Sequence, residues 1–377
     1  MTEAAGAGPG VERERAHVLI LNWNGWKDTL ECLESVFRLD WDDLRVIVCD
    51  NGSTDGSLDR IREWARGERP SPPTSVEALR ALTTPPVPKP IAFAEYTRTQ
   101  AESGGDRRAE APLILIDVGE NVGFAGGTNV GLRYLRTRRE PGVVWVLNND
   151  MVVAPDSLVR MIDVMHRPPA VDCVGATILE YDDPDRVQYS GGGVIKLWQG
   201  MPGESSAVGA RRGTPQAIPE RLDYVSGGCM VLRVETLAKA GLIDERYFLY
   251  GEDVDFSLQI RARGMRLGHS PGAEVWHKGG AAVGHRSPFH DYYMVRSALL
   301  LVHKFRPWLL PFTLAFVFYR CTLPKLVRGQ GDRLRAVLRA HRDFVSSIRG
   351  GERVSTESAA TDLSRAVPPS AEPNLSA

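Results

Sequence analysis

The sequence predicts an α/β protein whose mainly parallel β-sheet is covered by helices on both faces. Strand and helix patterns alternate from residue 17 onward, and polar residues follow several of the strands. This alternation is typical of parallel sheets, because the chain must cross over between neighbouring strands. Ligands bind to such sheets at the carboxyl ends of the strands. The functional residues are therefore expected along that edge.

The first elements follow this pattern closely. The apolar run at residues 17–21 predicts a buried strand, and a helix with one apolar face is expected from Asp28. A second strand, residues 44–50, ends in the polar turn "NGSTDGS", which contains helix-capping residues.

An irregular segment interrupts the alternation. Residues 67–112 contain "PSPP" and "TTPPVPKP", which favour an inserted loop or excursion over a part of the core. The alternation resumes with the strand "PLILIDV", a helix from about Ala125 to Arg136, and the strand "VVWVL".

Length and composition narrow the class of protein. The 377 residues suffice for one large α/β domain and an appendage, and the net charge of −1 argues against a dedicated nucleic-acid-binding protein. Five well-separated cysteines without a CxxC pair indicate neither a disulfide framework nor a zinc site, and favour a reducing cytoplasm. Residues 1–16 lack an apolar signal core and, like residues 351–377, are expected to be disordered tails.

Three polar residues interrupt the apolar stretch "VVWVLNNDMVV". Burying an unpartnered amide or carboxylate costs roughly 2 kcal/mol or more, so Asn148, Asn149 and Asp150 are expected at an open strand end or against a ligand. Asn22 and Asp50 also end predicted strands, and together these positions predict a site. A carboxylate such as Asp150 beside a diphosphate can hold Mg²⁺ or Mn²⁺, although an Asx turn after the strand is the alternative.

Acidic residues and a histidine follow later in the chain. Glu252, Asp253 and Asp255 begin an apparent helix, where they complement the helix dipole, but three exceed what a cap needs. A carboxylate beside others has a raised proton affinity, which suits a general base. His277 follows another short strand and is either structural or a second metal ligand opposite Asp150.

Six motifs together resemble a known family. They are, in order, "LNWNG", "CDNGSTDGS", "ENVGFAGGTN", "VLNND", "VSGGCMVLR" and "YGEDVDFSLQIRARG". Over about residues 17–285 the chain is similar to the family 2 inverting glycosyltransferases, especially their rhamnosyltransferase-like branch. The resemblance implies a GT-A fold, which is a Rossmann-like sheet flanked by helices, with segment 67–112 as a departure.

The resemblance also implies a role for each matching residue. Asp253 would take the proton of the acceptor hydroxyl, with Glu252 as its neighbour, and Asp150 and His277 would hold the divalent metal. Asn148 stands where the family has the first Asp of its DxD motif, which removes one negative charge. The residues implied next to the nucleotide and the donor sugar are Asn22, Asn24, Asp50, Asn51, Gly123, Asn129, Asn148, Asn149, Gly227 and Gly228.

The implied reaction moves a sugar from a nucleotide-sugar donor to a hydroxyl of a glycan or lipid-linked acceptor in cell-surface polysaccharide synthesis. L-rhamnose from dTDP-rhamnose is the first choice, and UDP- and GDP-sugars stay open. A sugar nucleotidyltransferase would need an early Gly-rich loop with Arg and Lys, which "LNWNGWKD" does not offer. A non-catalytic membrane-associated scaffold would not need Asp150 and Asp253 together.

The C-terminal part, residues 286–350, is expected to be a helical appendage that docks on a membrane. Tyr292 to Arg349 contain eleven Lys/Arg residues and two acidic ones. Within this span "PWLLPFTLAFVFY" is uncharged and aromatic at both ends, but shorter than the roughly 18 residues of a membrane-spanning helix. These features fit the anionic inner face of a cell membrane, with the enzyme on its cytoplasmic side. A helical hairpin that covers the catalytic domain is the alternative.

Overall fold

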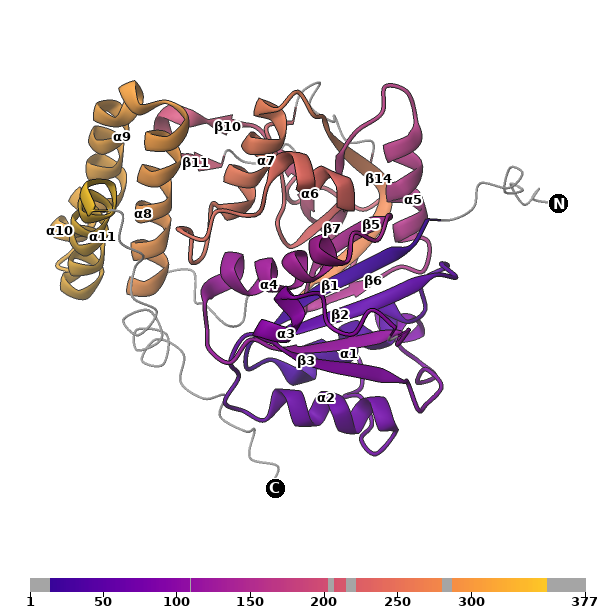
Figure 1. The fold of residues 1–377 in the computed structure, drawn as a ribbon. Helices are drawn as coiled ribbons and strands as arrows, with labels where there is room; N and C mark the ends of the chain where they lie inside the picture. Colours follow the sequence, from indigo (N-terminus) through magenta and orange to yellow (C-terminus); the bar gives the residue numbers. More distant parts are fainter. Residues whose placement is uncertain (1–13, 109, 203–206, 215–221, 280–286, 351–377) are drawn as a thin grey trace.

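The computed structural model describes residues 14–108, 110–202, 207–214, 222–279 and 287–350. Its central sheet contains ten strands (Figure 1). They are β1 (Ala16–Asn22), β2 (Leu44–Asp50), β3 (Phe93–Thr97), β4 (Leu113–Asp117), β5 (Val143–Asn148), β6 (Met151–Val153), β7 (Cys173–Glu180), β8 (Val187–Ser190), β13 (Cys229–Arg233) and β14 (Leu267–His277). Two small sheets pair β9 (Gly192–Gly193) with β12 (Tyr224–Val225), and β10 (Ile195–Lys196) with β11 (Met201–Pro202).

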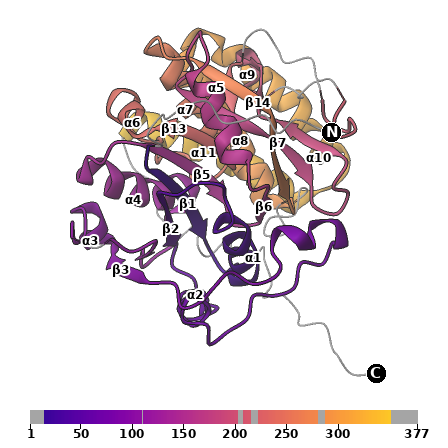
Figure 2. The same cartoon turned by 90° about the vertical axis from the view of Figure 1, so that its right-hand side faces the viewer.

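The strands of the central sheet lie in the order β3-β4-β2-β1-β5-β13-β7-β14-β6, and β8 pairs with β7. The first five are parallel to one another, whereas β13 runs antiparallel to both of its neighbours. The predicted α/β class with a mainly parallel sheet is therefore confirmed. In the view of Figure 2, the N-terminal elements occupy the lower part of the molecule and the later elements the upper part.

Helices cover both faces of this sheet. One apolar core lies beneath α1, α2 and α5, and the other beneath α3, α4, α6 and α7. The bounds of these helices are α1 (Trp26–Val36), α2 (Ser57–Arg66), α3 (Arg98–Glu102), α4 (Gly123–Arg138), α5 (Ser157–His166), α6 (Val234–Ala240) and α7 (Glu252–Ala262). Because the central strands are buried on both faces, their sequences are continuous apolar runs, as in "VLIL" and "VIVC".

The expectation of an inserted loop at residues 67–112 is wrong for its second half. β3 pairs in parallel with β4 at the edge of the sheet, and α3 follows it directly. The proline-rich part before β3 contains a 3₁₀-helix, Glu77–Leu82, and is fastened to α1. Buried Glu34 of α1 accepts hydrogen bonds from the Trp64 indole at 2.8 Å and from the Val87 N–H at 2.7 Å. A polar group supplied by α1 thus holds a segment that has no regular hydrogen-bond ladder.

The expected tail at residues 1–16 is also too long. Residues 1–13, like the expected tail at 351–377, lie outside the described residues, but Ala16 already begins β1. Its N–H donates to the carbonyl of Asp43 at 2.9 Å, and the carboxylate of Glu14 pairs with Arg233 at 3.1 Å. These contacts order the chain from Glu14 onward.

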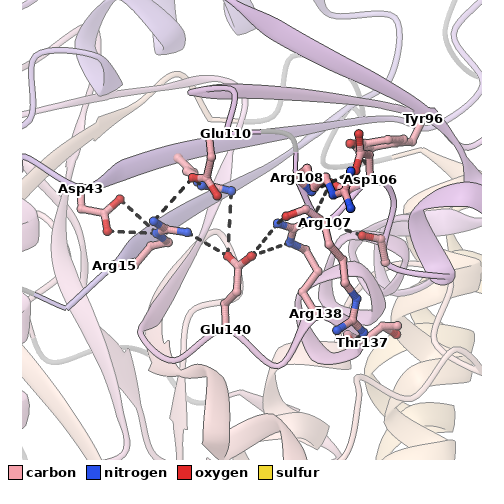
Figure 3. A network of polar contacts seen from close by, with 12 residues as sticks. Arg15, Asp43, Tyr96, Asp106, Arg107, Arg108, Glu110, Thr137, Arg138 and Glu140 are labelled. Carbon is pink, nitrogen blue, oxygen red and sulfur yellow. Dashed lines mark hydrogen bonds and ion pairs between the residues drawn. The ribbon is translucent and has the colours of Figure 1, made fainter.

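An ion-pair network closes the amino ends of the strands (Figure 3). Arg15, just before β1, lies 3.0 Å from Asp43 and 3.2 Å from Glu140, and Glu140 lies 2.6 Å from Arg138 at the end of α4. Buried Arg45 of β2 contacts Glu110. The network therefore joins the starts of two strands, one helix and the turn before β4. It lies at the amino ends of the strands, whereas the predicted site lies at their carboxyl ends.

His17 of β1 is buried beside this network, and neither of its ring nitrogens has a hydrogen-bond partner among the described residues. Burial lowers the pKa of His17 to about 4, so the unfolded chain takes up a proton first as the pH falls. The stability contributed by the neutral ring is present above about pH 6.5 and is lost between about pH 6.5 and pH 4, an effect on the order of 3 kcal/mol.

His17→Leu is expected to raise the free energy of unfolding by about 1–2 kcal/mol at pH 7, because it removes an unpartnered buried polar group, and by more at pH 5. Urea unfolding at both pH values measures this. His269→Leu is the control: burial lowers its pKa in the same way, but its Nε2 lies 3.1 Å from Thr177 Oγ1, so the same change removes a contact. Equal effects of the two substitutions at pH 7 would contradict the prediction.

The C-terminal part is helical and packs on one side of the sheet domain (Figure 1). It consists of α8 (Pro288–Phe305), a 3₁₀ turn (Pro307–Leu309), α9 (Leu310–Val317), a π-helical turn (Phe318–Thr322), α10 (Leu323–Val327) and α11 (Gly331–Gly350). An apolar cluster including Tyr293, Val337 and Phe344 joins α8 to α11. Lys304 of α8 also reaches the sheet domain, where its Nζ lies 2.7 Å from Asp255 and 2.9 Å from Asp244.

Candidate active site

The candidate site is built on the carboxyl ends of three neighbouring strands. Asn22 ends β1, Asp50 ends β2 and Asn148 ends β5, and the sheet order places β1 between the other two. Asn22 is paired in register with Asp50, and Leu21 with Asn148. The expectation that the polar residues after these strands share one edge agrees with this register.

Asn22 and Asp50 form the floor of this edge. The amide of Asn22 donates to the carboxylate of Asp50 at 2.6 Å, and Asp50 also accepts from the N–H of Ser53 at 3.0 Å and from its hydroxyl at 2.7 Å. Burial raises the pKa of Asp50, while the hydrogen bonds from Ser53 and Asn22 oppose that rise. Asn22 is fully buried, and its amide holds Asp50 and the turn that follows. Its implied place next to the nucleotide stays a prediction.

The turn after β2 is joined to its surroundings by two asparagines. Asn24 has a positive φ of 49°, and its side-chain oxygen accepts from the N–H of Thr54 at 2.8 Å. Asn51 donates to Asn121 at 3.0 Å and to the carbonyl of Gly123 at 3.2 Å. The two polar turns at the ends of β2 and β4 therefore form one surface.

The Gly-rich segment before and within α4 packs against the protein. Gly123 begins α4 with φ of 78°, and a Cβ there would lie 2.5 Å from the carbonyl oxygen of Phe248. Asn129 is fully buried and exchanges hydrogen bonds with the backbone of Ile243 at 2.8 and 3.1 Å. Both residues hold residues 243–248 beside α4. The implied place of this loop next to the nucleotide sugar stays a prediction.

Asn148 to Asp150 connect β5 with β6. The amide of Asn149 donates to Thr29 at 3.1 Å and to Asn22 at 3.4 Å, so it closes the floor from the other side. Asp150 follows in the turn, where its Oδ1 lies 3.2 Å from Nε2 of His277, the last residue of β14. The antiparallel pairing of β6 with β14 creates this contact, since it sets His277 opposite Met151.

The pair of Asp150 and His277 fits a divalent cation of which the protein supplies only part of the ligand shell. An imidazole nitrogen and a carboxylate oxygen suit Mn²⁺, and a carboxylate suits Mg²⁺. Within the described residues no group of three or more His, Cys, Asp or Glu side chains is placed to hold a metal. The remaining ligands of such a cation would have to come from a bound molecule, as phosphate oxygens do for Mg²⁺.

Asp253 lies in the first turn of α7 and is partly exposed. Its carboxylate accepts the N–H of Gly227 at 3.0 Å and that of Val254 at 2.8 Å, so both oxygens are oriented by the backbone. A Cβ on Gly227 would lie 2.8 Å from Asp253 Cβ, and one on Gly228 would lie 2.9 Å from the amide nitrogen of Asn148. The absence of side chains at Gly227 and Gly228 therefore leaves space for Asp253 and Asn148. These two side chains lie against neighbouring residues of the same segment.

The two carboxylates at the start of α7 influence each other. Burial, and then the charge of Asp253, raise the pKa of Glu252 to about 8. Burial also raises the pKa of Asp253, while the N–H groups of Gly227 and Val254 oppose this. Oε2 of Glu252 is buried without a partner among the described residues. Of the two, Asp253 is the partner that is partly exposed and oriented by the backbone.

Two residues near the site have roles that the sequence patterns did not predict. Asp255 belongs to the same acidic first turn but is fully buried, and accepts from Lys304, Tyr247 and Gln259 at 2.7, 3.2 and 2.7 Å. It fastens α7 to α8 and does not enlarge the acidic site. The other is Gln188 of β8, whose Oε1 lies 2.6 Å from Nδ1 of His277. No motif marks it, because 89 residues separate it from His277.

Comparison with known proteins matches the chain to two family descriptions. Residues 113–289 match "Glycosyltransferase like family 2", and residues 17–74 match "Glycosyl transferase family 2". The N-acetylglucosaminyl-diphospho-decaprenol L-rhamnosyltransferase of Mycobacterium tuberculosis is 25% identical over 257 residues, which cover 63% of this chain and 78% of the relative. The low-salt glycan biosynthesis hexosyltransferase Agl10 of Haloferax volcanii is 22% identical over 173 residues, or 44% of this chain; the match spans about half, 52%, of that relative.

Among solved structures, the chain is similar to a mannosyltransferase, PcManGT from Pyrobaculum calidifontis, in complex with GDP-Man and Mn²⁺. The TM-score is 0.45 at 16% identity, with 92% of this chain and 84% of the other covered. It is also similar to TarS residues 1–349 from S. aureus, with a TM-score of 0.45 at 14% identity over 90% of this chain and 92% of that one.

Proposed function

Because the chain belongs to the family 2 glycosyltransferases, we propose that it is an inverting enzyme that moves one sugar from a nucleotide-sugar donor to a hydroxyl of a glycan or lipid-linked acceptor. We propose cell-surface polysaccharide synthesis as the process. L-rhamnose from dTDP-rhamnose is the donor that we favour, because a rhamnosyltransferase that uses a lipid-linked substrate is 25% identical over most of its length. The observation that carries the proposal is the partly exposed Asp253 carboxylate, oriented by two backbone N–H groups beside the end of β5.

Asp253 acts as the general base in this proposal. The acceptor hydroxyl gives its proton to the carboxylate while its oxygen attacks the anomeric carbon of the donor. The bond from that carbon to the phosphate oxygen breaks on the opposite face, the nucleoside diphosphate leaves, and the configuration at the carbon inverts. A base held in one orientation supplies both proximity and proton transfer.

Glu252 complements this base. Burial and the charge of Asp253 raise the pKa of Glu252 to about 8, which favours its protonated form near neutral pH. A neutral Glu252 also leaves the negative charge of the pair on Asp253. In this proposal the role of Glu252, as the neighbour of the base, is to stay protonated.

The donor would lie across the ends of β1, β2 and β5. Asp50 and Asn51 order the turn that would face the base and ribose, and Asn148, at the end of β5, would bond a ribose hydroxyl. Asp150 and His277 would hold Mg²⁺ or Mn²⁺, which would neutralise negative charge on the leaving diphosphate. Since two protein ligands are found among the residues that the structure describes, the cation and the nucleotide are expected to bind together.

Calorimetric titration with dTDP, UDP and GDP, each with and without Mn²⁺, tests the donor site. One nucleotide is expected to bind more tightly when Mn²⁺ is present, and its identity defines the donor class. A folded protein that binds none of the three would overturn the donor site and favour the non-catalytic scaffold.

We further propose that the enzyme works at the cytoplasmic face of a membrane, with the C-terminal helices as its contact. The helical stretch Pro307–Val327 has 21 residues and a mean hydropathy of 1.2, so it is longer than the apolar run expected at residues 307–319 and could cross a membrane by length and composition. Only 22% of its most apolar window is buried. Its exposed side chains include Trp308, Phe312 and Tyr319, which are 66%, 63% and 67% exposed.

A flat position on the membrane surface fits the packing of this stretch better than a crossing. Thr313 and Val317 are fully buried, and the Phe316 ring packs on Trp198 at a centroid distance of 5.2 Å. One face is thus attached to the protein along its length, which leaves only the opposite face for lipid. Arg306, Arg320 and Arg328 are exposed along the stretch and suit anionic headgroups.

The double substitution Trp308→Ser and Phe312→Ser is expected to weaken binding to vesicles of phosphatidylcholine and phosphatidylglycerol by at least about tenfold, because two aromatic anchors are lost. Co-sedimentation with the vesicles measures this, and added salt should weaken the wild type as well. Val208→Ser removes another exposed apolar side chain outside the appendage and should change nothing. Equal binding of all three proteins would exclude this surface.

A further inference from the structure

We propose that Tyr250 binds the acceptor: its ring packs against a sugar of the acceptor, and its hydroxyl bonds a hydroxyl group of that sugar. This inference rests on the proposed function, because it concerns the molecule whose proton Asp253 would take. The family resemblance assigns roles to Glu252 and Asp253 of the motif that begins at Tyr250, but none to Tyr250 itself.

The backbone holds Tyr250 in a conformation that is uncommon for its residue type. Tyr250 has a φ of 65° and Gly251 has a φ of 82°, so two successive residues are left-handed directly before α7. Glycine and asparagine adopt this conformation readily, whereas a bulky aromatic residue rarely does. The turn alone therefore does not explain a tyrosine at this position, and its side chain must be considered.

The turn that carries Tyr250 is fixed from two sides. The carbonyl of Phe248 accepts the N–H of Phe124, in the first turn of α4, at 2.8 Å. The carbonyl of Leu249 accepts the hydroxyl of Ser297 in α8 at 3.3 Å. Helices α4 and α8 thus set the position of Tyr250 without using its hydroxyl.

The side chain of Tyr250 is partly buried, and its hydroxyl forms no hydrogen bond with the described residues. Its ring packs on His290 of α8, with the ring centroids 5.2 Å apart and the planes at 66°. Burial and the charge of Glu252 raise the pKa of Tyr250 to about 12, so the phenol keeps its proton at neutral pH and can donate a hydrogen bond. The side chain thus combines an apolar ring with an unused polar group.

Glu252 provides a second polar group without a partner beside Tyr250. It is 7% exposed, and its Oε2 is buried without a hydrogen bond from the described residues. Such an oxygen is costly to bury alone, which favours a bound molecule as its partner. Because the charge of Glu252 acts on the phenol of Tyr250, the two side chains lie near each other. Two unused polar groups therefore lie next to Asp253.

The position of Tyr250 favours the acceptor over the donor as its ligand. The donor is assigned to the ends of β1, β2 and β5, whereas Tyr250 packs on α8, the first helix of the appendage that we propose as the membrane contact. A lipid-linked acceptor would approach Asp253 from this side. A sugar offers an apolar face of C–H groups bordered by hydroxyls, which matches an aromatic ring with a phenolic hydroxyl.

Two substitutions separate the side chain from the backbone. Tyr250→Gly takes a φ of 65° without strain but removes the ring, so the amount of acceptor membranes that gives half-maximal turnover is expected to rise at least about 30-fold. Tyr250→Phe keeps the ring and loses the hydroxyl, so the same amount should rise about three- to tenfold, as for one lost hydrogen bond. Release of dTDP from dTDP-rhamnose, with increasing amounts of membranes from the source cells, measures both.

A binding measurement and a matched control complete the test. Both Tyr250 variants should bind dTDP with Mn²⁺ like the wild type in calorimetry, because the residues assigned to the donor are unchanged. Arg139→Gly is the control, since Arg139 is an exposed residue after α4 with a φ of 56°. It relieves the same kind of backbone conformation away from the site and should leave half-saturation by membranes unchanged.

The outcomes separate the inference from the function on which it rests. Wild-type half-saturation in either Tyr250 variant would overturn the contact with the acceptor. A lower maximal turnover of Tyr250→Gly at unchanged half-saturation would also overturn it, because Tyr250 would then only support the base. A wild type that releases no nucleoside diphosphate from dTDP-, UDP- or GDP-sugars with these membranes would overturn the proposed transfer and this inference together.

Discussion

Asp253→Asn is expected to reduce sugar transfer by about 100- to 10,000-fold while nucleotide binding is retained, because an amide cannot take the acceptor proton. The substitution keeps the size of the side chain and one of the two backbone hydrogen bonds, those from Gly227 at 3.0 Å and Val254 at 2.8 Å. It also removes a charge from a crowded pair of carboxylates. The protein should therefore stay folded while turnover is lost.

The measurement is release of nucleoside diphosphate from the donor in the presence of acceptor membranes, combined with thermal unfolding of the same samples. Asp255→Asn is the matched control, because it makes the same change two residues further along α7 at a fully buried side chain. It should lower thermal stability, since Lys304 loses a charged partner at 2.7 Å, but it should leave most of the activity. Near-wild-type turnover in folded Asp253→Asn would assign the base to another residue.

Asp150→Ala is expected to abolish the gain in nucleotide affinity that Mn²⁺ provides. The cation would lose the only carboxylate of the Asp150–His277 pair, and His277 alone holds such a cation poorly against water. A loss of at least about tenfold in affinity, or about 1.4 kcal/mol, should appear in calorimetry with Mn²⁺ and vanish without it.

Asp156→Ala serves as the control for this experiment. Asp156 follows the same connection by six residues, but it lies at the start of α5, where it pairs with Arg160 at 2.6 Å. It should bind nucleotide and Mn²⁺ like the wild type. If Asp150→Ala retained the full effect of Mn²⁺, the metal position between Asp150 and His277 would be wrong.

Burial on both faces explains why much of the sheet could be predicted. β1, β2, β4 and β5 are central strands, so the middle of each is a continuous apolar run and the alternation with helices is visible. β3 is an edge strand with the mixed sequence "FAEYT" and only partly buried or exposed side chains. It follows a proline-rich stretch, and nothing in its own pattern separates it from a loop. Its place in the sheet is decided by pairing with β4.

Some features of the site could likewise be predicted from the sequence, and others could not. The contact between Asp150 and His277 agrees with the pairing expected from the motifs, and the position of Asp253 at a helix start followed from its neighbours. The motifs place Asn22 and Asn129 near the predicted ligand, but they do not show which way each side chain points. Both are fully buried and bind the protein. Gln188 could not be found at all, because its contact depends on the order of three strands.

The position of the ion-pair network has a consequence for how this protein can evolve. Arg15, Arg138 and Glu140 act at the amino ends of the strands, whereas the residues assigned to the donor and the cation lie at the carboxyl ends. Changes among the charged residues can therefore tune how well the fold tolerates heat or acid without altering which sugar is accepted. The two ends of each strand form separate targets for selection.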